Sequence, residues 1–467
     1  MSVSQNKHFH LIGIGGSGMT PLAEIALHKG LIVSGSDQAI GRNCQRLIKH
    51  GATIHEGHRK ENLPNGKYTL VYSSAISDDN PELLGAKKQG FEVWHRSQFL
   101  KYLIGDKKLI AVAGTHGKTS TTAIISHMLE FCDFKPTSFI GGEVLGKEAY
   151  SYFGDGDYFV AELDESDGSF LNFNPYISIV NNIDLDHLDF YKNLDGIKDA
   201  FKIFLNNTDP EGLSILNWDN IHCHELAQDL DSNLRLAFGK RIGCDIRGLS
   251  FKTNNSGSSF KAAVERDLVD GVAPLIGDHN FQNILCALTV ARALELPINQ
   301  AVESLASLPG VGRRLNCLFS SDAVKVFDDY AHNPGKISAC VSAIKESHPD
   351  SHLAVIFQPH RYSRMKTMYN EFMQSFDDAD TLLLLPIFSA GEQDTGSYSP
   401  HDFAHGVASC SEIQTKLYSH VPNPAELVSP FEGKQKVVYL SVGAGDVYQL
   451  SHSLRDYFNG QEKREKE

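Results

Sequence analysis

The sequence predicts an α/β protein of three domains, the first and last Rossmann-like and the central one built around a glycine-rich phosphate loop. Two observations support this prediction. The chain has 467 residues, and single hydrophobic cores stop growing at roughly 250–300 residues. Short apolar strands alternate with helical patterns along the chain, a pattern typical of parallel sheets covered by helices, which bind ligands at the carboxyl ends of their strands.

Composition excludes several classes of protein. The chain is 41% hydrophobic and 21% charged, as in soluble globular proteins, and it contains no apolar run of about 18 residues, so no membrane insertion is expected. The N-terminus lacks a secretory signal, which favours a cytoplasmic location. A net charge of −14 opposes nucleic-acid binding. Eight widely spaced cysteines without a CxxC pair favour reduced thiols over disulfides or zinc.

The first domain is predicted over residues 1–107. A strand is expected at 9–14, a helix at 19–29, and further strands at 32–36 and 69–73. Residues 102–108, which contain Gly105 and three charges, are expected to form a linker before the strand at 109–113.

The central domain is predicted over 108–314 and the third over 315–467. Strands are expected at 158–163 and 177–182, a helix at 121–130, and a hairpin tip or surface loop at 253–259. The boundary is placed at 308–314 because Pro309, Gly310 and Gly312 interrupt the pattern there, and strand-helix alternation resumes at 324. The charged tail after Gly460 is expected to be frayed.

The sharpest motif is a glycine-rich loop between the strand at 109–113 and the following helix. It consists of Gly114, Thr115, His116, Gly117, Lys118, Thr119 and Ser120. Backbone N–H groups in such a loop form a nest for phosphate oxygens. Lys118, expected to face solvent, would reach the β- and γ-phosphates, and Thr119 would ligate Mg²⁺. The loop departs from GxxxxGK[ST] because Val112 replaces the first glycine.

Carboxylates lie at the ends of two predicted strands of this domain. Glu162, Asp164, Glu165 and Asp167 lie at the end of the strand at 158–163, and an Asp-Leu-Asp-His run ending at His187 comes after the strand at 177–182. A strand end beside a phosphate loop is where a Mg²⁺ ligand belongs. A surface acidic cluster is the alternative. His187 is interpreted as a ligand of a second Mg²⁺ or as a base, with an incidental loop histidine as the alternative.

Another glycine loop, Gly13 to Gly18, comes earlier in the chain and is called the first glycine loop below. It follows the first strand, and Asp37 ends the second strand. This pattern satisfies the dinucleotide fingerprint. NAD is one interpretation, but the diphosphate and ribose of a UDP group meet the same requirement. A tight turn without a ligand is the structural alternative.

Polar residues mark three further strand or helix ends. Residues 277–283 open an apolar helix and could contact a base or ribose, or merely cap the helix. Residues 328–334 and 358–364 each follow an apolar strand, and Arg361 and Arg364 have the spacing of a carboxylate or phosphate clamp. The His222-Cys223-His224 run lacks a complementary pair, so zinc is disfavoured there.

Taken together, these motifs resemble the Mur ligase family over nearly the whole chain. The shared segments are GIGGSGM, GSD, SSAI, AGTHGKTS, AELDESD, NIDLDH, GDHNFQN, GRR, DDYAHNP, QPHRYSR and GAGD. The resemblance implies a UDP-binding N-terminal domain, a central ATPase domain and a C-terminal domain that admits an amino acid. It implies an ATP- and Mg²⁺-dependent ligase, for which Mn²⁺ is a possible substitute, that joins L-alanine to UDP-N-acetylmuramate through an acyl phosphate. A monomer or homodimer is expected.

The resemblance also implies residue roles. Nucleotide contacts are assigned to the phosphate loop, His279, Asn280, Asn283, Arg314 and Asp329, and metal contacts to Thr119, Glu162 and His187. Substrate contacts are assigned to Gly15, Gly16, Ser17, Gly18, Met19, Asp37, Ser74, Glu165, Ser166, Tyr330, His360, Arg361 and Arg364. Lys118, His187, His332 and Arg364 are the catalytic candidates, with His187 and His332 both open as the base that deprotonates the amine.

Three alternatives remain at the level of sequence. A sister ligase attaches a recycled peptide to the same UDP-sugar, but it usually carries a GTFMGG-like first loop and lacks QPHRYSR. A nicotinamide oxidoreductase would explain the glycine loop at 13–18 but leave the phosphate loop at 114–120 and its carboxylates without a purpose. A non-catalytic regulator would have lost one of the key groups. The chain departs from the family at Asn333, where a second histidine is usual, and at Gly312, where lysine is usual. These departures bear on the choice of amino acid.

Overall fold

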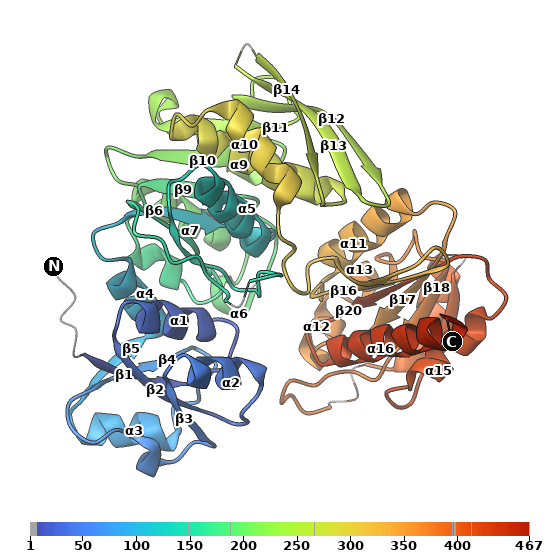
Figure 1. Ribbon diagram of the computed structural model, residues 1–467, viewed down its shortest axis with the longest axis horizontal. Helices are drawn as coiled ribbons and strands as arrows, with labels where there is room; N and C mark the ends of the chain where they lie inside the picture. The colour runs from blue at the N-terminus through green and yellow to red at the C-terminus, as the bar shows by residue number, and fades with distance from the viewer. Residues whose placement is uncertain are drawn as a thin grey trace. The chain divides into compact units, whose positions relative to one another are not determined.

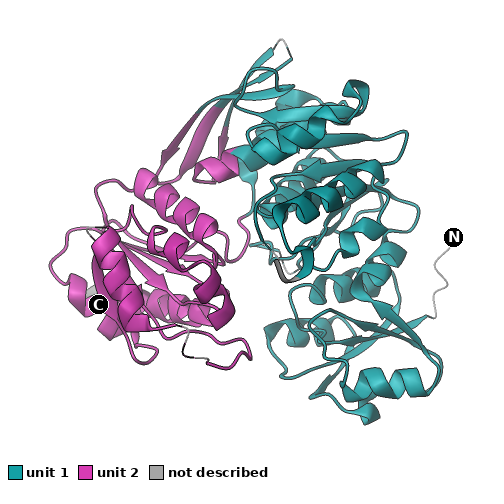
Figure 2. Cartoon of the chain, turned by 180° about the vertical axis from the view of Figure 1, so that it is seen from behind, with its two compact units in different colours: residues 1–250, 261–271, 282–309 teal, residues 251–260, 272–281, 310–467 magenta. Residues whose placement is uncertain are grey.

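The computed structural model describes residues 7–147, 149–186, 188–265, 267–394, 396, 398–411 and 413–466. These residues divide into two compact units, shown in Figure 2. The first comprises residues 1–250, 261–271 and 282–309, and the second comprises 251–260, 272–281 and 310–467. No described helix combines the length and the apolar character needed to cross a membrane.

A five-stranded parallel sheet in the order β3-β2-β1-β4-β5 begins the first unit (Figure 1). Its elements are β1 His8–Ile12, α1 Thr20–His28, β2 Ile32–Asp37, α2 Arg42–Lys49, β3 Thr53–Glu56, η1 Lys60–Asn62, β4 Thr69–Tyr72, α3 Pro81–Lys88, β5 Glu92–His95 and α4 Arg96–Ile104. Leu22 of α1 and Phe99 of α4 join the core on one face of the sheet, while Leu83 of α3 packs on the other.

A nine-stranded sheet follows in the order β14-β13-β12-β11-β10-β9-β6-β8-β7. Its first elements are β6 Lys108–Ala113, α5 Lys118–Phe131, β7 Thr137–Phe139, β8 Tyr158–Glu162, η2 Ser169–Asn172, β9 Ile177–Val180, α6 Leu188–Tyr191, α7 Leu194–Asn206 and β10 Leu213–Asn217. The remaining ones are α8 Ile221–Gln228, η3 Ser232–Leu234, β11 Arg235–Gly239, β12 Ile246–Asn254, β13 Gly257–Val264, β14 Asp267–Ala273, α9 Asp278–Ala293, α10 Ile298–Ser304 and η4 Leu305–Ser307. One apolar cluster runs from Phe9 of β1 to Phe204 of α7, so the first two sheets share a continuous core.

A six-stranded sheet in the order β15-β16-β20-β17-β18-β19 lies in the second unit, which also contains residues 251–260 and 272–281. Its elements are β15 Asn316–Ser320, β16 Val324–Asp329, α11 Pro334–Ser347, β17 His352–Phe357, α12 Tyr362–Thr367, α13 Tyr369–Met373, β18 Thr381–Leu384, α14 Pro400–Cys410, β19 Gln414–Leu417, α15 Pro424–Val428, η5 Ser429–Phe431, β20 Val437–Val442 and α16 Val447–Lys466. Only the β15–β16 pair of this sheet is antiparallel. Ile337 of α11 and Phe403 of α14 pack on one face, and Leu454 of α16 packs on the other.

The structure corrects two local predictions and confirms one. The predicted linker at 102–108 is shorter, because α4 extends to Ile104 and β6 begins at Lys108. The tail expected to fray is helical as far as Lys466, since α16 continues through Gly460. The predicted hairpin tip is confirmed at residues 255–256, between β12 and β13. All eight cysteines are free, four of them buried.

A buried polar network holds the end of β2, where Asp37 lies. The side chain of Glu82 on α3 is completely buried. Its oxygens accept hydrogen bonds from His10 Nε2 (3.0 Å), Ser36 Oγ (2.7 Å) and Asn62 Nδ2 (2.9 Å). The backbone N–H of Arg59 adds a fourth bond at 3.0 Å. A buried carboxylate is stable only when it is satisfied in this way, so the network joins β1, β2, η1 and α3 into one rigid group.

Replacing Glu82 by alanine should destabilise the protein because four donors, two of them on the buried residues His10 and Ser36, would lose their acceptor. We expect Glu82→Ala to lower the melting temperature by about 6 °C or more, on the scale of breaking a buried charged network. Differential scanning calorimetry provides the measurement. Glu61→Ala, at an exposed glutamate of the neighbouring η1, is the control and should melt within about 1 °C of the wild type.

The stabilisation by Glu82 should also depend on pH. Burial alone raises the pKa of Glu82, but the hydrogen bonds from His10, Ser36 and Asn62 outweigh it and hold the pKa below its usual value. A lowered carboxyl pKa contributes stability above the unfolded pKa of about 4.3, and the contribution is lost as pH falls through the folded pKa. The melting difference between wild type and Glu82→Ala should therefore shrink below pH 4. A constant difference from pH 7 to pH 3 would contradict an ionic contribution.

Candidate functional site

The phosphate loop lies between β6 and α5, where the sequence predicts it. Gly114 has φ of +128° and Gly117 has φ of +80°, conformations that glycine adopts most readily. A Cβ at Gly117 would lie 2.8 Å from Asn283 Oδ1, and one at Gly114 would lie 3.0 Å from the Asn182 carbonyl oxygen. Any other residue at either position would strain the backbone and bring its Cβ too close to a neighbouring atom, so both positions require glycine. The loop leads directly into α5, so its N–H groups and the helix N-terminus face the same ligand.

Asn182 fixes the shape of this loop from the strand end after β9. Its backbone oxygen accepts from Thr115 N at 3.1 Å. Its side chain accepts from His116 N at 2.7 Å and donates to the His116 carbonyl oxygen at 3.2 Å. The sequence analysis assigned Asn182 no role, although its place after an apolar strand was a usable signal.

Lys118 is held by a buried carboxylate, so the prediction that its side chain faces solvent is wrong. Its Nζ lies 2.9 and 2.7 Å from the two oxygens of Glu165 and donates to the Gly114 carbonyl oxygen at 2.7 Å. The side chains are 19% and 2% exposed. Burial alone lowers the pKa of Lys118, but the charge of Glu165, followed by those of Asp164 and Glu162, raises the pKa above its usual value. Lys118 is therefore a permanent cation at the start of α5.

The predicted metal ligands lie on adjacent elements. Glu162 ends β8 and is in register with Val112 of the neighbouring strand β6, so its side chain stands at the level of the phosphate loop. Thr119 is buried in the first turn of α5, which also contains Ser120. A Cβ at Gly141 would lie 1.8 Å from Glu162 Oε1, so a glycine is required beside this carboxylate. His187 lies outside the described residues.

Asp184 lies near the phosphate loop in the segment after β9. Its Oδ2 lies 3.3 Å from His116 Nε2. The hydrogen bond from His116 is the main reason that the pKa of Asp184 lies below its usual value. Asp184 therefore stays ionised and helps to orient the loop histidine.

The first glycine loop is held at the strand end as the fingerprint predicts. Gly15 N donates to Asp37 Oδ2 at 2.9 Å, and a Cβ at Gly15 would lie 2.7 Å from Cys44 Sγ. Gly16 N donates to the Gly13 carbonyl oxygen at 3.0 Å, which closes the turn, and Gly16 and Ser17 are exposed. The side chain of Met19 does not reach this surface, because it is buried in the core at the start of α1.

Arg96 connects the first glycine loop to the acidic segment after β8, and sequence reasoning missed it. Its guanidinium donates to Asp164 Oδ2 at 2.7 Å, and its NH1 would lie 2.6 Å from a Cβ at Gly18. Burial alone raises the pKa of Asp164, but Lys118 and Arg96 outweigh it and hold the pKa well below its usual value. Arg96 directly follows β5. This position could have indicated its role, because polar groups at the ends of parallel strands converge.

Two more predicted residues lie beside Arg96. Ser74 Oγ donates to Asp167 Oδ2 at 2.6 Å and lies 3.1 Å from His95 Nε2. Ser166 N donates to Asp164 Oδ1 at 3.1 Å. The strand ends of the first sheet therefore meet the acidic loop of the second sheet in one polar region of the first unit.

The predicted nucleotide residues on α9 fall in both units. In the first unit, buried Asn283 accepts a hydrogen bond from Thr121 Oγ1 at 2.9 Å, one turn into α5. In the second unit, Asn280 Nδ2 donates to the Ile276 carbonyl oxygen at 2.9 Å. Burial is the main reason that the pKa of His279, also in the second unit, lies below its usual value.

Asp329 organises the loop after β16 in the second unit. Its carboxylate accepts from Leu315 N and from Ala331 N, each at 2.7 Å. The guanidinium of Arg314 lies 5.6 Å from the centre of the Tyr330 ring. Asn333, the departure from the family, caps α11 by accepting from Lys336 N at 3.0 Å, a role that asparagine performs well.

His332, His360 and Arg364 gather near the ends of β16 and β17. The two imidazole rings are 6.1 Å apart, and Arg364 NH1 lies 3.0 Å from His360 Nδ1. Burial is the main cause that holds the pKa of His332 well below its usual value, and burial followed by the charge of Arg364 lowers the pKa of His360 to about 4. Both rings are therefore neutral near pH 7. Arg361 is exposed, with φ of +70°.

Comparison with known proteins agrees with this arrangement. Residues 8–108 match the catalytic domain of the Mur ligase family, residues 112–291 match the Mur ligase middle domain, and residues 313–444 match the Mur ligase glutamate ligase domain. The prediction of three α/β domains is thereby confirmed.

Curated relatives and solved structures extend this match to the full chain. A UDP-N-acetylmuramate--L-alanine ligase of Desulforapulum autotrophicum is 37% identical over 460 residues, covering 96% of this chain and 98% of the relative. One of the same name from Persephonella marina is 36% identical and covers 98% of each chain. The crystal structure of the Thermotoga maritima UDP-N-acetylmuramate-alanine ligase superposes with a TM-score of 0.83 at 26% identity, covering 97% of this chain and 99% of that one. Because the matches extend over all three sheets and nearly the entire sequence, the chain belongs to the Mur ligase family.

Proposed function

We propose that this chain uses ATP to join L-alanine to the lactyl carboxylate of UDP-N-acetylmuramate, an amide-forming step of peptidoglycan precursor synthesis. The observation that carries the proposal is the connection of two glycine loops of the first unit through the acidic segment after β8. Arg96, beside the first loop, forms an ion pair with Asp164 of that segment. Glu165 of the same segment binds Lys118 of the phosphate loop. One loop suits the phosphates of ATP and the other the diphosphate of a UDP-sugar. The two relatives described above carry this activity in their names.

The residues around Lys118 supply the charge stabilisation needed for phosphoryl transfer. The carboxylate of the sugar attacks the γ-phosphate, and the ammonium of Lys118 stabilises the charge on the transferred group. Lys118 has three N–H donors, and its contacts are two Glu165 oxygens and the Gly114 carbonyl oxygen. Contact with a phosphate therefore requires Lys118 to exchange one of these bonds.

A hard divalent cation fits the oxygen donors beside the loop. The Thr119 hydroxyl and the Glu162 carboxylate are the kinds of ligand that Mg²⁺ prefers, and Mn²⁺ accepts the same donors. We assign Mg²⁺ to these two residues together with His187. When bound, the ion neutralises charge on the β- and γ-phosphates.

The amino acid is assigned to the second unit. Arg364 is suited to hold its carboxylate, with Tyr330, His360 and Arg361 as the surrounding contacts. His332, kept neutral by burial, is able to accept the proton of the incoming amine, as is His187. His279, Asn280, Asn283, Arg314 and Asp329 are assigned to the adenosine part of ATP, and Gly15 to Gly18, Asp37, Ser74 and Ser166 to the UDP-sugar.

We further propose domains at residues 1–107, 108–314 and 315–467, which bind the UDP-sugar, ATP and the amino acid respectively. A cytoplasmic monomer or homodimer is the proposed state. Phosphate release with ATP, UDP-N-acetylmuramate and a panel of amino acids tests the function. Release that depends on UDP-N-acetylmuramate and is fastest with L-alanine supports it, whereas release only with a peptide co-substrate identifies the sister activity.

Removing the Lys118 side chain should abolish turnover and also destabilise the protein. Lys118→Ala leaves the Glu165 carboxylate buried without its cation, so we expect phosphate release below about 1% of wild type and a lower melting temperature. The double variant Lys118→Ala/Glu165→Gln also removes the buried negative charge that Lys118 had faced, and it should recover most of the melting temperature but none of the activity.

The control for Lys118 is Lys202→Ala, at an exposed lysine paired with Asp229 at 2.7 Å, which should leave activity and melting unchanged. Activity within about tenfold of wild type in either Lys118 variant, measured at saturating ATP, would contradict the assigned role.

Arg364→Lys should weaken L-alanine binding even though it keeps the charge. A planar guanidinium can hold a carboxylate by two parallel hydrogen bonds and also bond His360. An ammonium group cannot form the same pair of parallel bonds. We expect the KM for L-alanine to rise at least about tenfold, the scale of one charged hydrogen bond, with the KM for ATP nearly unchanged.

Lys366→Ala, at an exposed lysine on the same helix α12, serves as the matched control for Arg364. If Arg364→Lys instead raised the KM for ATP or the UDP-sugar and left that for alanine unchanged, Arg364 would belong to another subsite.

A further inference from the structure

A segment of the central domain, residues 143–156 between β7 and β8, lies against α1 and α2 of the N-terminal domain within the first unit. We call this segment the strap; Glu148 within it lies outside the described residues. Its contacts with the N-terminal domain involve Glu143, Tyr150 and Phe153. Neither the strap nor its contacts were singled out by the sequence motifs.

Tyr150 makes the most deeply buried of these contacts. Its backbone N–H donates to Glu24 Oε2 at 2.9 Å, while Arg46 donates to Glu24 Oε1 at 2.8 Å. The side chains of Glu24 and Arg46 are 3% and 13% exposed. The Arg46 guanidinium also lies 4.6 Å from the centre of the Tyr150 ring. The ring and backbone of Tyr150 are therefore held by a buried ion pair of the N-terminal domain.

The hydroxyl of Tyr150 extends this contact to the first glycine loop. It donates to Asn43 Oδ1 at 3.2 Å, and Asn43 Nδ2 donates to the Gly15 carbonyl oxygen at 2.9 Å. Only this orientation of the amide satisfies both partners. Burial raises the pKa of Tyr150, so the phenol remains a hydrogen-bond donor at neutral pH.

The Gly15–Gly16 peptide is thus fixed on both sides. Its carbonyl oxygen is held by Asn43, and its N–H is held by the Gly13 carbonyl oxygen at 3.0 Å. The preceding N–H, that of Gly15, is held by Asp37. The orientation of this peptide sets the direction of the loop that a diphosphate would meet.

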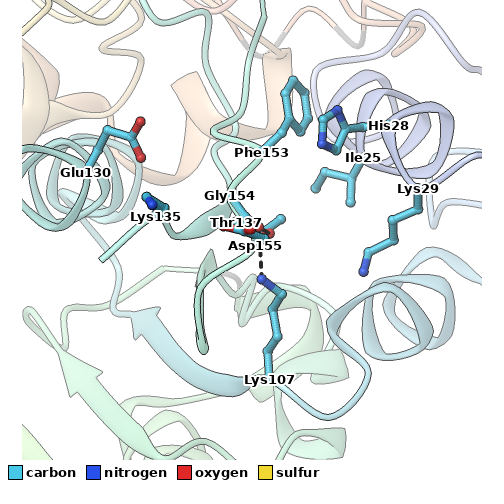
Figure 3. Close-up of a pocket in the computed structure, with 10 residues that line it drawn as sticks. All are labelled: Ile25, His28, Lys29, Lys107, Glu130, Lys135, Thr137, Phe153, Gly154 and Asp155. Carbon is cyan, nitrogen blue, oxygen red and sulfur yellow. Dashed lines mark hydrogen bonds between the residues drawn. The ribbon is translucent and has the colours of Figure 1, made fainter. Parts of the chain in front are cut away.

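The far end of the strap is anchored independently of Tyr150. Phe153 stacks on His28 of α1, with ring centres 4.8 Å apart. Lys107 Nζ donates to the carbonyl oxygens of Gly154 (2.9 Å) and Gly156. Figure 3 shows His28, Lys107, Phe153 and Gly154 among the residues that line a cavity bounded by α1, the strap and the end of α5. Loss of the Tyr150 hydroxyl therefore leaves the strap in place.

We propose that Tyr150 and Asn43 are positioning residues through which the central domain sets the affinity of the first glycine loop for the UDP-sugar. This inference rests on the proposed function of that loop. Neither residue is assigned a contact with the ligand; they act through the Gly15 carbonyl. The central domain thereby shapes the glycine loop at 13–18, whose own contacts with the UDP-sugar are assigned to residues of the N-terminal domain.

A double-mutant cycle in the full-length protein tests the inference. Tyr150→Phe keeps the ring over Arg46 and removes only the hydroxyl, so we expect a rise of about fivefold in the KM for UDP-N-acetylmuramate, the scale of one neutral hydrogen bond. The kcat and the KM for ATP should stay within about twofold. Asn43→Ala should raise the same KM by at least as much. The double variant should be no worse than Asn43→Ala, because the hydroxyl acts through Asn43.

The matched control is Arg42→Ala. Arg42 forms an ion pair with Glu143 of the same strap at 3.1 Å, but its side chain is 79% exposed, so the KM for the UDP-sugar should not change. Additive effects of Tyr150→Phe and Asn43→Ala, or an equal rise in the KM for ATP, would overturn the proposal.

Calorimetric titration with UDP, without ATP or alanine, separates this inference from the proposed ligase activity. Weaker UDP binding by Tyr150→Phe and Asn43→Ala than by wild type supports the positioning role whichever carboxylate the enzyme activates. Equal UDP affinity of wild type and both variants refutes the positioning role even if the wild type proves to be an alanine ligase.

Discussion

The buried ion pair between Lys118 and Glu165 is the interaction on which the reactive end of the central sheet depends. An ammonium group with 19% of its side chain exposed and a carboxylate with 2% exposed are each costly to bury alone and acceptable only together. The two glycines of the phosphate loop, forced into left-handed conformations, place Lys118 at the first position of α5. Glu165 then holds the ammonium of Lys118 beside the Gly114 carbonyl oxygen, at the start of α5.

Parallel topology explains why polar groups from distant segments meet around this pair. In the first sheet, β1 leads into the first glycine loop, β2 ends at Asp37, and Arg96 directly follows β5. In the central sheet, β6, β8 and β9 end at the phosphate loop, the acidic cluster and Asn182. Because the carboxyl ends of parallel strands meet at one edge of a sheet, each sheet brings its own set of polar groups together. Arg96, bonded to Asp164 at 2.7 Å, connects the two sets.

The first domain and most of the second form one compact unit for a physical reason. A single apolar cluster extends from β1 into the central domain, and the strap adds a buried polar contact at Glu24, Arg46 and Tyr150. A continuous core resists relative motion, while directed hydrogen bonds fix orientation. The strap therefore provides a structural route by which changes in the central domain reach the Gly15 peptide.

The fold class, most of the elements near the candidate site and the chemical types of its polar groups could be predicted from the amino-acid sequence, because these depend on local patterns. Apolar runs, glycines at left-handed positions and polar residues after strands can all be read within a few positions. The partners of these groups follow only from the packing of the folded chain. Lys118 and Glu165 are 47 positions apart, Arg96 and Asp164 are 68 apart, and Asn43 and Tyr150 are 107 apart. No local pattern encodes such pairs, since strand order and side-chain direction bring them together, and the same long-range packing turned a lysine expected to face solvent into half of a buried ion pair.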